Sequence, residues 1–347
     1  MTRQPLLARF VLVATAVCAP LGAQTPLFTD GPAFGGSKVF SEGMNPLANP
    51  ARVGQAPAGY YFSFVDGDQR AQDNKSILAA TVADPAALAR LADAPWALRT
   101  RAYGFSAVKN SANFALTRED LNGMLFRPQP VAAAGFLDGR RARVDRLSVG
   151  GGGPVQQGSS TAMGFNVRVE RWSMGQTVQA YNAAGPGALN FASAESDLLN
   201  ASGTSNRAWN IGVDTGLVLE MAQGVRVGLT ADQLLAKHLG DVYLQPQFRA
   251  GLQLDLGQVT RLSLEADINS VERMPFPVKQ QAAAASLRFA VSPATTFLVG
   301  AERRKIDDAS VTRGGASLLI RTSSLLVGIG FQAGQDRPMK GATLMVN

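Results

Sequence analysis

The sequence predicts an all-β protein, a transmembrane antiparallel β-barrel of about fourteen strands with a short N-terminal plug segment. Three observations predict this fold: an export signal opens the chain, apolar and polar residues alternate along the expected strands, and short connections alternate with long ones. Only 17% of the residues are charged, whereas about 25% is usual in soluble proteins. Beyond the signal, no apolar run approaches the roughly 20 residues of a membrane-spanning helix.

Residues 1–23 are predicted to be a cleaved signal peptide, with an uncleaved anchor as the alternative. Arg3 and Arg9 form its basic start, residues 10–23 form its apolar core, and cleavage is expected after Ala23. Val17 precedes the single cysteine, Cys18, where a lipoprotein signal needs a small residue. Loss of the two arginines lowers the net charge from +7 to +5. This excess is spread along the chain, so nucleic-acid binding is not indicated.

Alternation with a period of two is clearest in the C-terminal half, where it predicts strand after strand. In residues 209–221, Trp209, Ile211 and Leu217 share one face, and Asp214 and Glu220 share the other. The same pattern predicts the first strand at 60–65 and the last at 340–346. The further strands are expected at 101–109, 112–117, 163–171, 225–232, 248–256, 261–268, 281–291, 296–304, 314–321 and 324–333, and one more between the turn at 172–173 and the loop that begins at 182.

The connections between these strands alternate in length. Short turns are expected at 110–111, 172–173, 222–224, 257–260, 292–295 and 322–323, and the longest loops at 66–100, 118–160 and 182–208. Bacterial outer-membrane barrels have short periplasmic turns and long outer loops. In hydrocarbon a sheet must close on itself, because no water is available to satisfy open edges. We therefore expect residues 59–347 to form the barrel in the outer membrane, in contact with its lipid.

Two helical stretches and a glycine run interrupt the strand pattern. In residues 83–96, Asp84 is the expected N-cap, Pro85 the first helical residue and Pro95 the stop. A helical turn is expected within residues 230–240, with Gly240 as its C-cap. The run at 150–154 is expected to be a flexible connector, because it lacks the Gly-Lys-Ser/Thr ending of a phosphate loop.

The sequence shows no constellation for catalysis or metal binding. His238 is the only histidine, and the chain contains neither a G-x-S-x-G nor an H-E-x-x-H motif. The acidic run at 66–74 resembles a calcium loop, but Arg70 stands where an oxygen ligand belongs. We expect no enzyme activity, no cofactor and no metal.

Charged residues of both signs fall on the polar faces of the predicted strands. Such side chains would either pair with one another and hold water inside the barrel, or line a polar passage that tunes the entry of a solute. The lumen-facing candidates are Asp214, Glu220, Arg226, Arg249, Asp255, Glu265, Arg288 and Glu302.

The segment before the first strand carries a resemblance to a known family. Residues 43–57 read GMNPLANPARVGQAP, and Asn49, Pro50 and Ala51 resemble the Asn-Pro-Ala element of the long-chain fatty-acid transporter (FadL) superfamily, which includes PorV-like and TraF-type conjugal-transfer barrels. The resemblance implies a fourteen-stranded barrel in which residues 24–58 form a plug or hatch. Pro50 fixes its own φ and biases Asn49 toward an extended backbone.

The resemblance and the pattern leave three functions open. The first is a non-enzymatic channel or transporter for small hydrophobic solutes. The second is a structural or docking component of an envelope secretion or conjugal-transfer machine, with a protein of that machine as its partner. The third is a soluble periplasmic β-sandwich, since such sheets also alternate.

Overall fold

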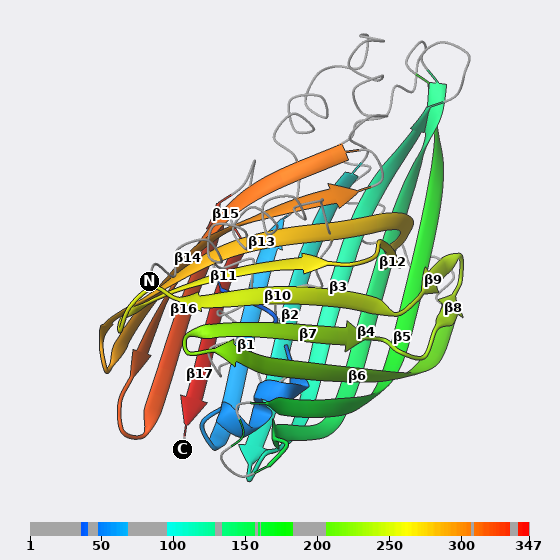
Figure 1. Ribbon diagram of the computed structural model, residues 1–347. Helices are drawn as coiled ribbons and strands as arrows, with labels where there is room; N and C mark the ends of the chain where they lie inside the picture. Colours follow the sequence, from blue (N-terminus) through cyan, green and yellow to red (C-terminus); the bar gives the residue numbers. More distant parts are fainter. Residues whose placement is uncertain are drawn as a thin grey trace.

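The protein is described by a computed structural model (Figure 1) that covers residues 36–40, 48–68, 96–128, 134–156, 159, 161–182, 206–306, 309–333 and 339–346. In this part of the chain, fourteen antiparallel strands form one closed ring. The ring strands are β1 (Gly59–Asp68), β2 (Trp96–Lys109), β3 (Ala112–Pro128), β4 (Ala134–Pro154), β5 (Ala162–Asn182), β6 (Asn206–Ala222), β7 (Val225–Asp232), β10 (Gln247–Asp255), β11 (Thr260–Asp267), β13 (Phe276–Ser292), β14 (Thr295–Ile306), β15 (Ala309–Arg321), β16 (Leu325–Ala333) and β17 (Met339–Val346).

The ring closes where the first and last strands pair, and the small strand β12 does not interrupt it. β1 pairs with β17 as well as with β2, and β11 pairs with β13 from Thr260 opposite Phe289 to Ala266 opposite Ala283. Each ring strand therefore has a hydrogen-bonded neighbour on both sides, which is what a sheet in hydrocarbon requires. The all-β barrel predicted from the sequence is confirmed.

Four small elements lie outside the ring. β8 (Lys237–Leu239) and β9 (Val242–Leu244) form a hairpin of their own, and β12 (Val271–Arg273) pairs only with β13 within the main sheet. A short 3-10 helix, η2 (Pro50–Gln55), precedes β1. Among the helices of the described residues, none is long and apolar enough to cross a membrane.

The two faces of the ring differ because side chains alternate along each strand. On β1, Tyr60 is 56% exposed and Phe62 is 47% exposed, whereas Tyr61 and Val65 are fully buried inside. Large apolar side chains point outward on the other strands too, including Phe165, Ile211 and Ile329. An apolar outer face is the surface that lipid requires.

The loop predicted at 118–160 and the turn predicted at 172–173 are both wrong, because strands occupy these positions. Residues 118–160 were expected as a loop, but most of them belong to β3 and β4. The turn expected at 172–173 does not exist, because β5 runs unbroken for 21 residues. Cross-strand pairing stabilises these long strands, as with Leu116 opposite Leu147. The prediction missed β4 and divided β5 into two strands, and these two errors cancel. The predicted number of strands therefore agrees with the structure.

Two further expectations need correction. The helical turn expected at 230–240 is absent, because this stretch ends β7 and then forms β8. Residues 150–154 are the end of β4 rather than a connector, paired with β5 from Gly150 opposite Asn166 to Pro154 opposite Ala162. Glycine has no strong preference for a strand, but backbone pairing with β5 holds these residues in an extended conformation.

The other predicted connections have mixed outcomes. The turn at Asn110 and Ser111 has the positive φ values, 50° and 65°, of a two-residue hairpin turn. The ends of the loops expected at 66–100 and 182–208 are strand residues of β1, β2, β5 and β6. Residues 69–95 and 183–205 lie outside the described part of the chain, and so does nearly all of the helix expected at 83–96.

Candidate functional site: the barrel interior

The described residues 36–40 and 48–56, here called the N-terminal segment, lie against the inner face of the ring. Its η2 helix contacts β3, β4, β5 and β6. Val39, Ala51 and Val53 are fully buried. Val53 also packs with Tyr61 and Leu298 in an apolar cluster near the short-turn end of the barrel. The segment therefore occupies interior space that would otherwise be open.

Asn49 links the two stretches of the N-terminal segment. Its side-chain oxygen accepts a hydrogen bond from the Ala51 N–H at 3.0 Å, and its Nδ2 donates to the Val39 carbonyl at 2.8 Å. Asn49 is the N-cap of η2 in an extended conformation, and Pro50 is the first helical residue. Since Asn49 is fully buried, these bonds replace the water that its amide would otherwise need.

Glycines in the wall let the N-terminal segment approach the sheet closely. A Cβ atom added to Gly216 of β6 would lie 1.8 Å from Asn49 Oδ1. Added to Gly152 of β4 or Gly164 of β5, it would lie 2.1 or 2.2 Å from the Pro50 carbonyl oxygen. No larger residue fits at these three positions unless the segment moves.

Glu265 of β11 is the main attachment point for residues 37–39. Its carboxylate accepts hydrogen bonds from Ser37 Oγ at 2.7 Å, from the Lys38 N–H at 3.0 Å and from the Val39 N–H at 2.9 Å. The same carboxylate pairs with Arg249 Nη1 at 2.8 Å. Glu265 thus joins the wall to the segment through both charge and backbone hydrogen bonds.

A second set of charges surrounds the Lys38 side chain. Lys38 forms an ion pair with Asp232 at the end of β7. Next to this pair, Arg168 lies 3.1 Å from Asp214 and donates to Gln233 Oε1 at 2.7 Å. All of these side chains are buried, so each charge depends on its partners for solvation.

The structure places the eight predicted lumen candidates in different settings. Asp214, Arg249, Glu265 and Glu302 are buried on the inner face, and Glu302 pairs with Arg304 at 3.1 Å. Arg226 and Asp255 pair with each other at 3.1 Å near the short-turn end. Arg288 is half-buried on the inner side of β13, and Glu220 is exposed at the end of β6. The described charges thus mostly pair with one another or with the N-terminal segment.

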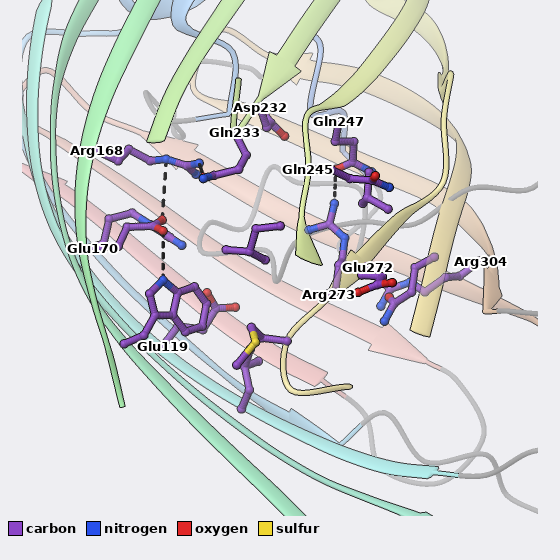
Figure 2. Close-up of a pocket in the computed structure, with 17 residues that line it drawn as sticks. Glu119, Arg168, Glu170, Asp232, Gln233, Gln245, Gln247, Glu272, Arg273 and Arg304 are labelled. Atoms are coloured by element: carbon purple, nitrogen blue, oxygen red, sulfur yellow. Dashed lines mark hydrogen bonds and ion pairs between the residues drawn. The ribbon is translucent and has the colours of Figure 1, made fainter. Parts of the chain in front are cut away.

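A cavity of about 100 Å³ lies inside the barrel between the N-terminal segment and the long-loop end. Figure 2 shows Arg168 and Glu170 on one side of it, with Gln245, Gln247 and Arg273 opposite. Glu170 accepts hydrogen bonds from Trp172 Nε1 at 3.1 Å and Asn210 Nδ2 at 2.8 Å, and it pairs with Arg146 at 2.7 Å. The apolar part of the lining consists of Leu121, Trp172, Leu244, Val271 and Met274.

The β8–β9 hairpin covers the cavity on the long-loop side. Leu239 and Val242 of the hairpin pack with Leu121 and Trp172 of the wall and with Met274. The hairpin is also attached by a single arginine of β4. Arg140 lies 2.7 Å from Asp241 and 3.0 Å from Asp138, and its guanidinium stands 5.4 Å from the centre of the Phe276 ring.

No group of three or more His, Cys, Asp or Glu side chains that could hold a metal ion occurs among the described residues. Each acidic group of the interior described above instead has an arginine or lysine partner. The arrangement can bind and orient a small molecule, but it offers no paired nucleophile and base.

No protein-family model and no curated protein matches the sequence. Several solved structures do match. The toluene transporter TodX of Pseudomonas putida superposes with a TM-score of 0.56 and 9% identity, over 94% of this chain and 98% of that one. The toluene transporter TbuX of Ralstonia pickettii gives 0.54 and 12%, over 91% and 96%. The monoaromatic hydrocarbon channel CymD gives 0.53 and 10%, over 89% and 93%.

These structures match over most of this chain. The protein has the barrel fold of these transporters and channels. At such low identity the likeness concerns the fold alone.

Within this barrel, several interior residues could not be identified from the sequence. Lys38 lies in the segment expected to form a plug, but nothing in the sequence around it predicts its ion pair with Asp232. Arg140 and Asp241 are 101 residues apart, and Arg140 fell within the expected loop 118–160. Trp172 was assigned to a turn at the membrane edge, whereas its indole points inward to Glu170. Residues 138–148 carry polar side chains on both faces of β4, so no clear alternation signalled this strand.

Proposed function

We propose that the protein is a non-enzymatic outer-membrane channel through which small hydrophobic solutes pass. Residues 1–23 act as its export signal, and residues 24–58 as a plug that includes Asn49, Pro50 and Ala51. The single observation that carries the proposal is the cavity between two closures. The N-terminal segment lies on the short-turn side of this cavity, and the β8–β9 hairpin lies on the long-loop side.

One side of the cavity suits a solute that is small and mainly apolar, although twelve of the seventeen lining residues are polar or charged. An apolar cavity of about 150 Å³ is enough to bind benzene in a protein interior. The present cavity of about 100 Å³ is about a third smaller, so it has to widen to hold such a ring. Leu121, Leu244 and Met274 provide an apolar wall for such a body. The three proteins of the same fold are named for toluene or monoaromatic hydrocarbons, which supports the same size class here.

The charged side of the cavity does not contradict an apolar solute. Glu170 is already bonded to Arg146, Asn210 and Trp172, so its charge is compensated. A passing solute would therefore touch the apolar side without desolvating an unpaired charge. For passage, the hairpin has to open on one side and the N-terminal segment has to shift on the other.

Uptake by whole cells tests the proposal. Cells that lack the protein should take up radiolabelled toluene, used as a probe, more slowly than cells in which it is restored. Met274→Trp, which adds a large side chain to the lining, should reduce uptake to the level of the deletion. Ile329→Trp, on the outer surface, is the matched control and should restore uptake fully. Equal uptake with and without the protein, for toluene and for a panel of similar solutes, would refute the proposal.

A further inference from the structure

The outer face of β1–β6 changes from apolar to charged between neighbouring cross-strand rows. A row of directly paired outward residues runs through Phe105, Leu116, Leu147, Val169 and Ile211. Two residues further along each strand, the next row consists of Tyr103, Arg118, Asp145, Arg171 and Trp209. The row after that consists of Asp66, Arg101, Asp120, Arg143, Ser173 and Arg207.

The charged rows lie toward the end of the barrel that carries the long connections. The turn at Asn110 and Ser111 closes the opposite end of β2 and β3, and the row with Leu116 lies nearer to it. In outer-membrane barrels the long connections face outward from the cell. The change from apolar to charged therefore falls where the outer leaflet meets water.

Arginines outnumber acids on this face. Arg101, Arg118 and Arg143 each pair with an aspartate: Asp66 at 3.4 Å, Asp145 at 2.6 Å and Asp120 at 2.6 Å. Three more outward arginines, Arg141, Arg171 and Arg207, are exposed, and none of them forms an ion pair among the described residues. Among the described side chains, the face thus carries three positive charges that its acids do not balance.

A surface hollow of about 1120 Å³ joins the apolar row to the charged rows. Arg118, Arg143 and Arg171 border its charged part, and Leu116 and Val169 contribute to its apolar part; Tyr103, Phe105, Leu147 and Trp209 complete the apolar part of its lining. The hollow offers apolar contact beside a set of guanidinium groups. That arrangement matches an amphiphile whose acyl chains lie along the barrel and whose anionic head stands at its rim.

We propose that this face binds the phosphorylated headgroup of an outer-leaflet glycolipid, the lipid A part of lipopolysaccharide. Arginine is suited to phosphate because its planar fork donates two parallel hydrogen bonds. Arg141, Arg171 and Arg207 provide the uncompensated charge, while the aspartates hold the paired arginines in place. The apolar part of the hollow continues into the wall that faces lipid, where acyl chains lie. A protein partner would not require this continuity. The inference goes beyond the proposed transport function and does not depend on the solute.

Binding of purified lipid A to the full-length protein in detergent micelles tests the inference. Arg141→Gln with Arg171→Gln should weaken binding on the order of 20-fold, because each arginine near an anionic headgroup contributes a factor of roughly five. The matched control is Arg303→Gln with Lys305→Gln, two outward cations on β14, seven strands away around the ring. It should leave the affinity unchanged. Retained heat-dependent gel mobility of both variants shows that both barrels are folded.

Lipid A from which the phosphates have been removed separates the headgroup from the acyl chains. It should bind the wild-type protein about as weakly as phosphorylated lipid A binds the β4–β5 variant. Equal losses in both double variants would mean that net charge alone attracts the lipid, and would overturn the site. The same holds if the phosphates make no difference, or if binding of lipid A by the wild-type protein cannot be detected.

Discussion

Two walls of the barrel differ in length by more than a factor of two. β7, β10 and β11 have 8, 9 and 8 residues, close to the roughly 9–11 that a tilted strand needs to span a membrane. β4 and β5 have 21 residues each. In Figure 1 their ribbons, cyan to green, rise at the upper right well beyond the β8–β9 hairpin. The short wall is about as long as one membrane crossing, whereas the long wall is about twice that length.

The two walls also hold the N-terminal segment by different means. The short wall adds charge to close contact, since Glu265 and Asp232 bind residues 37–39 and a Cβ atom added to Gly228 of β7 would lie 2.3 Å from Val39 Cγ1. The long wall uses close contact, since Gly152 and Gly164 leave room for the Pro50 carbonyl. Beyond the membrane, the long wall supports the hairpin on its inner face and the arginine rows on its outer face. Fixing the segment and shaping the entrance are thus tasks of different strands.

Glu265→Ala should have the largest effect, because it breaks the attachment on the short wall. The change removes one of the carboxylate partners of Arg249, leaving its pair with Asp267, and removes the acceptor of the Lys38 and Val39 N–H groups. Breaking a buried pair in this way costs about 3–5 kcal/mol. We expect the free energy of unfolding, measured with urea in lipid vesicles, to fall by that amount.

The matched control for this prediction is Glu220→Ala. Glu220 is an exposed glutamate at the end of β6, and its removal should change the free energy of unfolding by about 0.5 kcal/mol or less. A single cysteine at Ser37 should become reactive to a polar maleimide in the Glu265→Ala background. If the two glutamate variants are equally stable, charge does not hold the segment.

Gly164→Val tests the contact on the long wall and should have the next largest effect. Its Cβ would fall 2.2 Å from the Pro50 carbonyl oxygen, so the segment or the strand has to move. Overpacking of this kind costs about 1–3 kcal/mol. Gly175→Val on the same strand meets no atom within 4 Å and should leave the melting temperature unchanged. Equal behaviour of the two variants would show that η2 does not press on β5.

The barrel could be predicted from the sequence because lipid imposes a simple rule on every strand. The short wall obeys that rule for its whole length, so residues 225–232 were assigned with their observed bounds. The turn at Asn110 was found because two polar residues separate two alternating runs.

The long wall could not be predicted as well, because its outer face stops being apolar halfway. Arg118, Asp120, Arg141 and Arg143 alternate with inward Glu119, Leu121 and Ala142, so both faces are polar in part and the period of two is hidden. The contacts of the interior could not be predicted for another reason. Lys38 meets Asp232, and Arg140 meets Asp241, only after the ring has closed. Pairing over such distances in sequence leaves no local pattern.

Arg140→Ala addresses the hairpin on the inner face of the long wall. It removes the bonds to Asp241 and to the Pro275 carbonyl, but the apolar contacts of Leu239 and Val242 remain. Charge-assisted hydrogen bonds of this kind contribute about 1.5 kcal/mol or more. We therefore expect the hydrogen-exchange protection of residues 237–244 to fall roughly tenfold. Arg303→Ala on β14 should leave it unchanged, and unaltered protection in Arg140→Ala would mean that apolar packing alone holds the hairpin.

Arg118→Gln should have the smallest effect. It tests whether charges on the outer face of the long wall contribute to stability as those on the inner face do. Arg118 pairs with Asp145 at 2.6 Å, but their side chains are 51% and 39% exposed. Exposed pairs contribute about 0.2–1 kcal/mol because water screens them. The free energy of unfolding should therefore change by less than about 0.5 kcal/mol. A loss as large as that of Gly164→Val would mean that the outer charges brace the long wall, rather than forming a surface for other molecules.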